Sequence, residues 1–267
     1  MNRLDRKFKE LNLRNLKAFA AYITAGDPGL DVTKRIVLAL EEGGADIIEL
    51  GIPFSDPLAD GPTIQAASMR ALKKRINLEK VFRLVKDLRK VTQIPVLFMT
   101  YYNPVLKYGL GRFFKKCSSN GVDGVIIPDL PQEEAKDVVT LGKDMRVATI
   151  FLAAPTSTKD RIRSIAKVSR GFIYYVSLTG VTGARARLPQ DVTSNVKLIK
   201  AETRKPVLVG FGVSTAGQAR SISRIADGVI VGSAIVKIIE ESAGDTRRLL
   251  SRILKFSKKL AKAVHNA

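Results

Sequence analysis

The 267-residue sequence has very few of the residues that build disulfides and metal centres. It contains one cysteine, Cys117, and one histidine, His265, which lies in a C-terminal segment that we expect to fray. A single cysteine cannot form an internal disulfide, and one cysteine with one histidine cannot assemble a Cys/His metal site. We therefore expect no metal and no redox chemistry in this chain.

Long apolar runs are also missing. No stretch has membrane-spanning length, and residues 1–13 carry charges every few positions where a secretory signal would have an apolar centre. Tryptophan is absent, so the stacking platforms typical of RNA and single-stranded DNA recognition have little material. These absences predict a cytoplasmic protein without a membrane contact and give poor support to a nucleic-acid partner.

Positive charge, in contrast, is abundant, with 45 Lys and Arg against 25 Asp and Glu and a net charge of +20. Residues 1–17, 70–90 and 244–267 together carry 17 of these 20 net charges. Basic residues that alternate with an apolar stripe favour a solvated outer helix face over a polyanion site. The alternative, a nucleic-acid-binding side role, would show as affinity that falls steeply with salt.

Short apolar runs alternate with amphipathic stretches along the chain, which is typical of βα units around a parallel sheet. Helical spacing is clear in 78–88 and in 249–264. Eight strands in about 250 residues predict an α/β fold, a (β/α)8 TIM barrel that occupies residues 1–267 as one domain. The expected strands are 17–24, 45–50, 95–101, 123–128, 147–152, 172–177, 206–210 and 227–231.

Two helices beyond the repeat are expected. Residues 2–13 place Leu4, Phe8 and Leu11 on one face, which would plug the bottom of the barrel. A short helix is expected to begin near Ser233, after the eighth strand.

Two acidic residues follow the second strand. Glu49 lies between apolar neighbours at the strand end, so partial burial would raise its pKa and suit it to move protons. The stiff loop PFSDPLADGPTIQ then brings Asp60, and paired carboxylates with separated pKa values can divide acid and base roles. A solvated strand-end acid and a helix-capping aspartate are the alternatives.

Glycine-bearing segments follow the last three strands, at 180–183, 210–212 and 232–234. Exposed backbone N–H groups and a helix beginning at Ser233 favour a phosphate ester as ligand. No strand ends in lysine, so a Schiff-base aldolase lacks its nucleophile, and the chemistry would have to be acid–base.

Five segments match, in order, the motifs of one enzyme family. They are ITAGDPG (23–29), IELGIPFSDPLADGPTIQ (48–65), GVIIPDLP (124–131), SLTGVTGAR (177–185) and GFGVS (210–214). Through them the chain closely resembles the tryptophan synthase alpha chain family, from about residue 5 to residue 260. It departs from that family only in being unusually basic.

The resemblance implies a lyase of tryptophan biosynthesis that cleaves indole-3-glycerol phosphate to indole and D-glyceraldehyde 3-phosphate. It also implies a beta-chain partner, in an alpha2-beta2 heterotetramer, that carries pyridoxal phosphate and joins indole to L-serine; no cofactor is expected in this chain. The glycine segments alone would equally fit another phosphate-binding barrel enzyme, but the acidic loop argues against it. A purely regulatory subunit is disfavoured because Glu49 and Asp60 are intact.

Residue roles carry over from the family position by position. Glu49 matches the general acid/base and Asp60 the carboxylate that accepts a hydrogen bond from the indole N–H. The resemblance assigns to the indole pocket Tyr22, Thr24, Ile64, Phe98 and Tyr101, and it places Tyr174 near Glu49 and the substrate. It assigns to Thr182 the closure of a loop onto Asp60, and to the phosphate Gly183, Gly212, Gly232 and Ser233. The implied partner contacts are Pro53, Asp56, Pro57 and Asn103.

Overall fold

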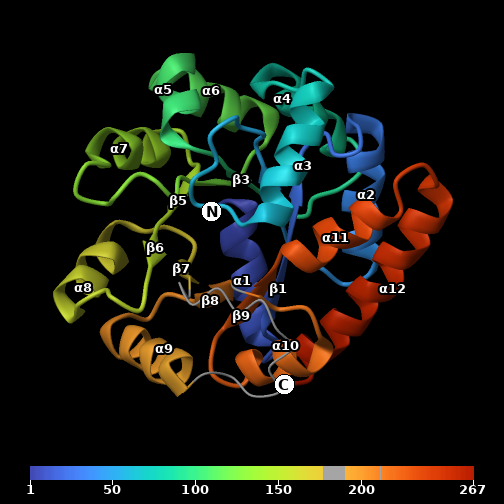
Figure 1. The fold of residues 1–267 in the computed structure, drawn as a ribbon. Coiled ribbons are helices and arrows are strands. Elements are labelled where there is room, and N and C mark those ends of the chain that lie inside the picture. Colours follow the sequence, from blue (N-terminus) through green and yellow to red (C-terminus); the bar gives the residue numbers. More distant parts are fainter. Residues whose placement is uncertain (177–189, 211) are drawn as a thin grey trace.

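A computed structural model describes residues 1–176, 190–210 and 212–267 of the chain. Nine parallel strands of these residues form one sheet in the order β5-β4-β3-β2-β1-β9-β8-β7-β6, and helices surround it (Figure 1). The predicted barrel is therefore confirmed. The strands are β1 (Ala18–Thr24), β2 (Ile47–Gly51), β3 (Val96–Met99), β4 (Gly124–Ile126), β5 (Ala148–Ile150), β6 (Leu152–Ala153), β7 (Ile173–Val176), β8 (Val207–Gly210) and β9 (Gly228–Val231).

The strand predicted at 147–152 is divided in two. Ala148–Ile150 pairs with β4, whereas Leu152–Ala153 pairs with β7 on the other side. Phe151 lies between them, with its N–H directed to the Ser169 hydroxyl (3.3 Å) and its carbonyl accepting from Tyr174 N (3.2 Å). The two ends of the sheet are thus consecutive in sequence, which is where the barrel closes.

The helices form the outer ring, and one connection holds more of them than the sequence predicts. Two helices lie between β2 and β3, in agreement with the helical spacing of 78–88, and two instead of one lie between β3 and β4. The helices are α1 (Arg3–Leu13), α2 (Leu30–Glu42), α3 (Pro62–Lys73), α4 (Leu78–Leu88), α5 (Tyr102–Tyr108), α6 (Leu110–Asn120), α7 (Lys136–Asp144), α8 (Lys159–Val168), α9 (Gln190–Glu202), α10 (Ala216–Ser223), α11 (Ser233–Glu241) and α12 (Thr246–His265).

Helix α1 closes one end of the barrel, as predicted. Asn2 and Asp5 form a capping box at its start. Leu4 and Leu11 are buried among the side chains inside the barrel, and the Phe8 ring lies 5.9 Å from that of Phe172. The helix therefore seals the N-terminal end, which leaves the opposite end open for function.

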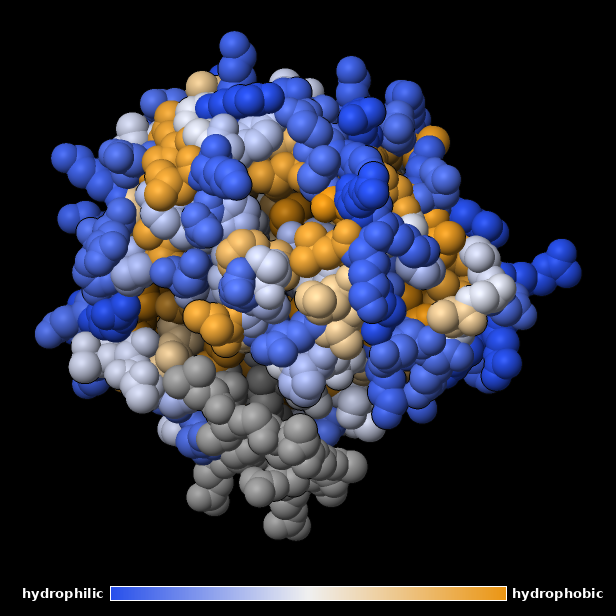
Figure 2. Space-filling model, turned by 45° about the horizontal axis from the view of Figure 1, so that its top comes forward, coloured by the Kyte–Doolittle hydropathy of each residue, from blue (hydrophilic) through white to orange (hydrophobic). Residues whose placement is uncertain are grey.

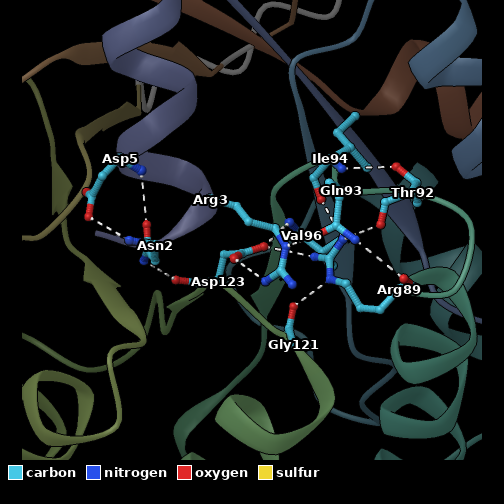
Figure 3. A network of polar contacts seen from close by, with 10 residues as sticks. All are labelled: Asn2, Arg3, Asp5, Arg89, Thr92, Gln93, Ile94, Val96, Gly121 and Asp123. Carbon is cyan, nitrogen blue, oxygen red and sulfur yellow. Dashed lines mark hydrogen bonds and ion pairs between the residues drawn. The ribbon is translucent and has the colours of Figure 1, made fainter.

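A charged network fastens this plug to the barrel. Asp123, which is almost fully buried, accepts from Arg89 (2.8 Å) and from Arg3 of α1 (3.1 Å), as Figure 3 shows. Asp123 also accepts from the backbone N–H of Val96, so one carboxylate joins α1 to the starts of two strands. Arg89 also donates hydrogen bonds to the backbone carbonyls of Gly121 and Ile94.

The C-terminal segment is ordered rather than frayed. Helix α12 runs to His265, whose Nε2 lies 2.9 Å from the Asp46 carboxylate. Leu260 and Val264 are buried at the same end of the helix, so apolar packing against the barrel holds the segment in place.

Candidate active site

Glu49 points into the barrel from β2. Residues alternate between the two faces of a strand, and the register that pairs Glu49 with Tyr22 and with Leu97 places it on the inner face. Only 1% of Glu49 is exposed, and its Oε1 has no hydrogen-bond partner among the described residues. Burial, and then the charge of Asp60, raise the pKa of Glu49 to about 8. Glu49 is thus a protonated acid at neutral pH with an oxygen free for a ligand.

Asp60 reaches the same region from the loop between β2 and α3. The Tyr101 hydroxyl accepts a hydrogen bond from the backbone N–H of Ala59 (2.9 Å) and donates one to the Asp60 carboxylate. Phe54, earlier in the loop, packs on the Tyr101 ring at a centroid distance of 5.3 Å. Burial raises the pKa of Asp60 to about 6, against the opposing effect of the Tyr101 hydrogen bond. Asp60 is therefore mainly ionised at neutral pH.

Two tyrosines complete the polar part of the site, and glycines make room for them. A Cβ on Gly51 would overlap the Tyr22 hydroxyl, and one on Gly210 would lie 2.6 Å from the Tyr174 hydroxyl. Burial raises the pKa of both tyrosines, and both sense the charges of Glu49 and Asp60. The hydroxyls of Tyr22 and Thr24 are 3.5 Å apart. The structure thus brings together five of the predicted residues near Glu49, namely Tyr22, Thr24, Asp60, Tyr101 and Tyr174.

An apolar cluster lies next to these polar groups. Tyr22 packs with Ala67 and Val236, and Ile64 and Met99 flank them. On the face in Figure 2, apolar side chains gather around a hollow near the centre, while hydrophilic ones cover the periphery. Met99, Ala67 and Val236 were missed by the sequence analysis. The register that places Glu49 beside Leu97 would have indicated Met99, because inward residues recur every second position.

The assignment of Phe98 to the indole pocket is wrong. Phe98 is fully buried on the outer side of β3, where its ring lies 5.5 Å from that of Phe82 in α4. Leu97 and Met99 face inward, so Phe98 must point outward by the alternation of the strand. Met99 takes the place in the pocket that the sequence analysis gave to Phe98.

Two of the predicted phosphate residues, Gly232 and Ser233, lie at the start of α11. Gly232 caps the helix without a side-chain hydrogen bond, and its carbonyl accepts from Ile235 and Val236. The N–H groups of exposed Ser233 and of Ala234, which precede these two donors, are directed out of the helix start toward any anion placed there. Gly212 is exposed and has a φ of 46°. Thr182 and Gly183 lie outside the described residues.

The predicted partner contacts differ in exposure. Asp56 and Asn103 are exposed and Pro57 is half-buried, whereas Pro53 is buried and offers little surface. Leu58, next to Pro57, is 93% exposed, and Leu106 of α5 is 54% exposed. Leu58 and Leu106 were not predicted as partner contacts, because the exposure of an apolar side chain is seen only in the structure.

The described residues hold no cluster of three or more His, Cys, Asp or Glu that could bind a metal ion. In the same residues no helix combines the length and the apolar character that a membrane crossing needs. Cys117 is buried in α6, where burial raises the pKa of its thiol.

A barrel with two carboxylates of different pKa and a helix N-terminus at its open end defines an acid–base enzyme that acts on a small anionic substrate. Comparison with known proteins gives the family. The family model described as "Tryptophan synthase alpha chain" matches residues 8–265. The chain belongs to the tryptophan synthase alpha chain family, and it is a lyase of tryptophan biosynthesis that catalyses the alpha reaction, the cleavage of indole-3-glycerol phosphate.

Individual relatives agree along nearly the whole chain. A tryptophan synthase alpha chain of Geotalea uraniireducens is 50% identical over 93% of both chains, and one of Geotalea daltonii is 49% identical over 91% of this chain and 92% of its own. Among solved structures, tryptophan synthase subunit alpha of Legionella pneumophila matches with a TM-score of 0.93 and 36% identity over 100% of both chains. A chain of the Pyrococcus furiosus tryptophan synthase a2b2 complex matches with a TM-score of 0.87 and 40% identity, covering 92% of this chain and 99% of its own.

Proposed function

We propose that Glu49 and Asp60 divide the acid–base work of the alpha reaction. The supporting observation is the burial of both carboxyl groups, which raises the pKa of Glu49 to about 8 and that of Asp60 to about 6. Between these values the inner carboxyl group is protonated and the outer one is ionised. A proton donor and an anionic hydrogen-bond acceptor are thus available together at neutral pH.

We take the steps of the reaction from the family resemblance and assign them to these two groups. Glu49 gives its proton to C3 of the indole ring, which places a positive charge on the ring, and Asp60 accepts a hydrogen bond from the ring N–H and stabilises that charge. The Glu49 carboxylate then takes the proton of the hydroxyl on the adjoining side-chain carbon. The bond from that carbon to C3 breaks, its electron pair restores the aromatic ring, and indole and D-glyceraldehyde 3-phosphate result.

The surroundings supply orientation. Tyr22, Ile64 and Met99, with Ala67 and Val236, offer the apolar walls for the indole ring. The first turn of α11 after Gly232, with exposed Ser233, would bind the phosphate, and exposed Gly212 is assigned to it on the family resemblance. We assign the same role to Gly183, and the closing role to Thr182, on the family resemblance alone.

The partner is proposed to be the tryptophan synthase beta chain, in an alpha2-beta2 assembly, because the Pyrococcus furiosus relative belongs to such a complex. Its contact surface would include Asp56, Pro57 and Asn103, together with the exposed Leu58 and Leu106. Pyridoxal phosphate is expected in that partner and not in this chain, and the assembly is expected to be cytoplasmic.

Glu49→Gln tests the proposal. The amide cannot deliver a proton, so indole release should fall by about three orders of magnitude while indole-3-glycerol phosphate still binds. Asp60→Asn should reduce turnover by about two orders of magnitude, because the ring charge loses its anionic partner. The measurement is indole release with and without the beta chain, with Glu42→Gln on the outer face of α2 as control. Turnover by Glu49→Gln within tenfold of the unmodified protein would refute the role of Glu49.

A further inference from the structure

One charged cluster lies near the site but takes no part in the chemistry described above. Arg70, in the last turn of α3, makes a bidentate contact with the Asp27 carboxylate, through Nε (3.0 Å) and Nη2 (2.8 Å). Its third nitrogen, Nη1, contacts Glu240 at the end of α11 (2.7 Å). The Asp27 side chain is 2% exposed, so Arg70 is the cation that accompanies a buried charge. Arg70 thus joins the loop after β1, α3 and α11.

Helix α3 carries Asp60 at its other end. Asp60 and Gly61 directly precede Pro62, the first residue of the helix, and Gln65 of the first turn donates to the Asp60 carbonyl (2.8 Å). A shift or rotation of α3 therefore moves the backbone that holds the Asp60 carboxylate.

Helix α11 carries the phosphate end of the site in the same way. It begins at Ser233, and Val236 of its first turn packs with Tyr22 and with Ala67 of α3. The two helices are neighbours at the rim of the barrel, as Figure 1 shows. Each helix thus has a site element at its start, whereas the Arg70 cluster joins their ends.

We propose that Arg70 is a positioning residue that fixes the separation between Asp60 and the phosphate-binding start of α11. It does so by joining the end of α3 both to buried Asp27 and to Glu240 of α11, and it touches no substrate atom. The proposal rests on the proposed function, because it takes the ring to lie near Asp60 and the phosphate near Ser233. A substrate held at both ends is sensitive to the distance between the two subsites, whereas a fragment that occupies only one subsite is not.

This difference gives the test. Indole occupies the ring subsite alone, glycerol 3-phosphate occupies the phosphate subsite alone, and indole-3-glycerol phosphate spans both. Dissociation constants of the two fragments are measured by calorimetry on the full chain. KM and kcat for indole-3-glycerol phosphate are measured on the chain assembled with its beta chain.

Arg70→Lys keeps a cation beside Asp27 but cannot hold two carboxylates with a planar fork. We expect its KM to rise about tenfold, with both fragment dissociation constants within about twofold of the unmodified chain. Glu240→Ala, which leaves the buried Arg70–Asp27 pair intact, should raise KM in the same selective way by about threefold. If Arg70→Lys folds poorly, the KM of Glu240→Ala serves as the test of the proposal.

Arg252→Met is the matched control. Arg252 of α12 holds the same end of α11 through Glu241 and Ser242 (2.7 Å each), but it does not bridge to α3. The KM of Arg252→Met for indole-3-glycerol phosphate should stay unchanged. An unchanged KM in both cluster variants would overturn the proposal, and so would weaker glycerol 3-phosphate binding in step with KM, which would mean that the cluster only supports α11. Failure of the proposed function is seen separately, as turnover in Glu49→Gln or as absence of fragment binding in the unmodified chain.

Discussion

The carboxyl groups of Glu49 and Asp60 differ chiefly in their distance from water. Glu49 comes from a strand inside the barrel, where desolvation keeps its proton on. Asp60 comes from a loop at the mouth, where a tyrosine hydroxyl favours the ionised form and offsets part of the desolvation. Two residues of nearly the same chemistry thereby differ in charge at neutral pH, Glu49 being neutral and Asp60 negative.

A bell-shaped pH dependence of kcat/KM should follow. Turnover requires Asp60 ionised, so the rate rises with pH through about 6, and it requires Glu49 protonated, so the rate falls through about 8. The measurement is the initial rate of indole release at subsaturating substrate from pH 5 to about pH 9.5 in buffers of constant ionic strength. A profile that keeps rising above pH 8 would mean that Glu49 acts only as a base.

The sequence predicts the role of a single residue well where the residue belongs to a motif, and poorly where the role depends on the direction in which the side chain points. Glu49 and Asp60 could be proposed from a buried strand end and a stiff acidic loop. Phe98 was misplaced because an aromatic strand residue fits a pocket and a core equally well, and only the inward or outward direction separates the two. Val236 and Ala67 carry no signal in one sequence, because small apolar helix residues are commonplace in cores.

At the level of elements, the alternation of apolar runs and amphipathic stretches was sufficient to predict eight parallel βα units, and helical spacing was sufficient to predict the plug formed by α1. It was insufficient for the break at Phe151, because a continuous apolar run does not reveal that its halves pair with different neighbours. The second helix after β3 was also missed, because the turn that separates α5 from α6 contains only one residue of the turn-forming kind, Gly109.

The network at the base of the barrel allows a prediction about the plug. Asp123→Ala leaves Arg89, whose side chain is 10% exposed, without its carboxylate and removes the acceptor of the Val96 N–H. We expect a loss of about 3 kcal/mol in the free energy of unfolding, measured by urea denaturation of the full chain.

Glu133→Ala serves as the comparison for that variant. It breaks an ion pair with Arg161 in which both side chains are about half exposed, and it should cost under about 1 kcal/mol. Equal losses in the two variants would show that the Asp123 network adds nothing beyond a surface ion pair.

For the whole molecule, the net charge of +20 lies mainly outside the site. The basic residues of α12 sit on its outer face, where Lys255, Lys259 and Lys262 are exposed, while Leu249, Ile253 and Leu260 are buried. Some of the charge is neutralised locally, as in the pair of Arg252 with Glu241 (2.7 Å). The extent of residues 1–267 as a single domain remains a prediction.

Replacing Lys255, Lys259 and Lys262 together by glutamine should leave kcat/KM within about twofold at 0.15 M salt, where charges are screened over about 8 Å. The assay is indole release at 0.02 M and 0.15 M salt, and a larger effect is expected only at the lower concentration. A drop of tenfold or more at 0.15 M would assign the α12 charges a direct part in substrate capture.

The close approach of Tyr22 to Gly51 limits the order in which the sequence can change over evolutionary time. Because a methyl group at position 51 would overlap both the hydroxyl and the ring of Tyr22, any larger residue there is unacceptable while that ring remains. A smaller residue at position 22 removes the conflict but also removes a wall of the pocket. Lineages that carry a side chain at position 51 are therefore expected to have lost the aromatic ring at position 22 first.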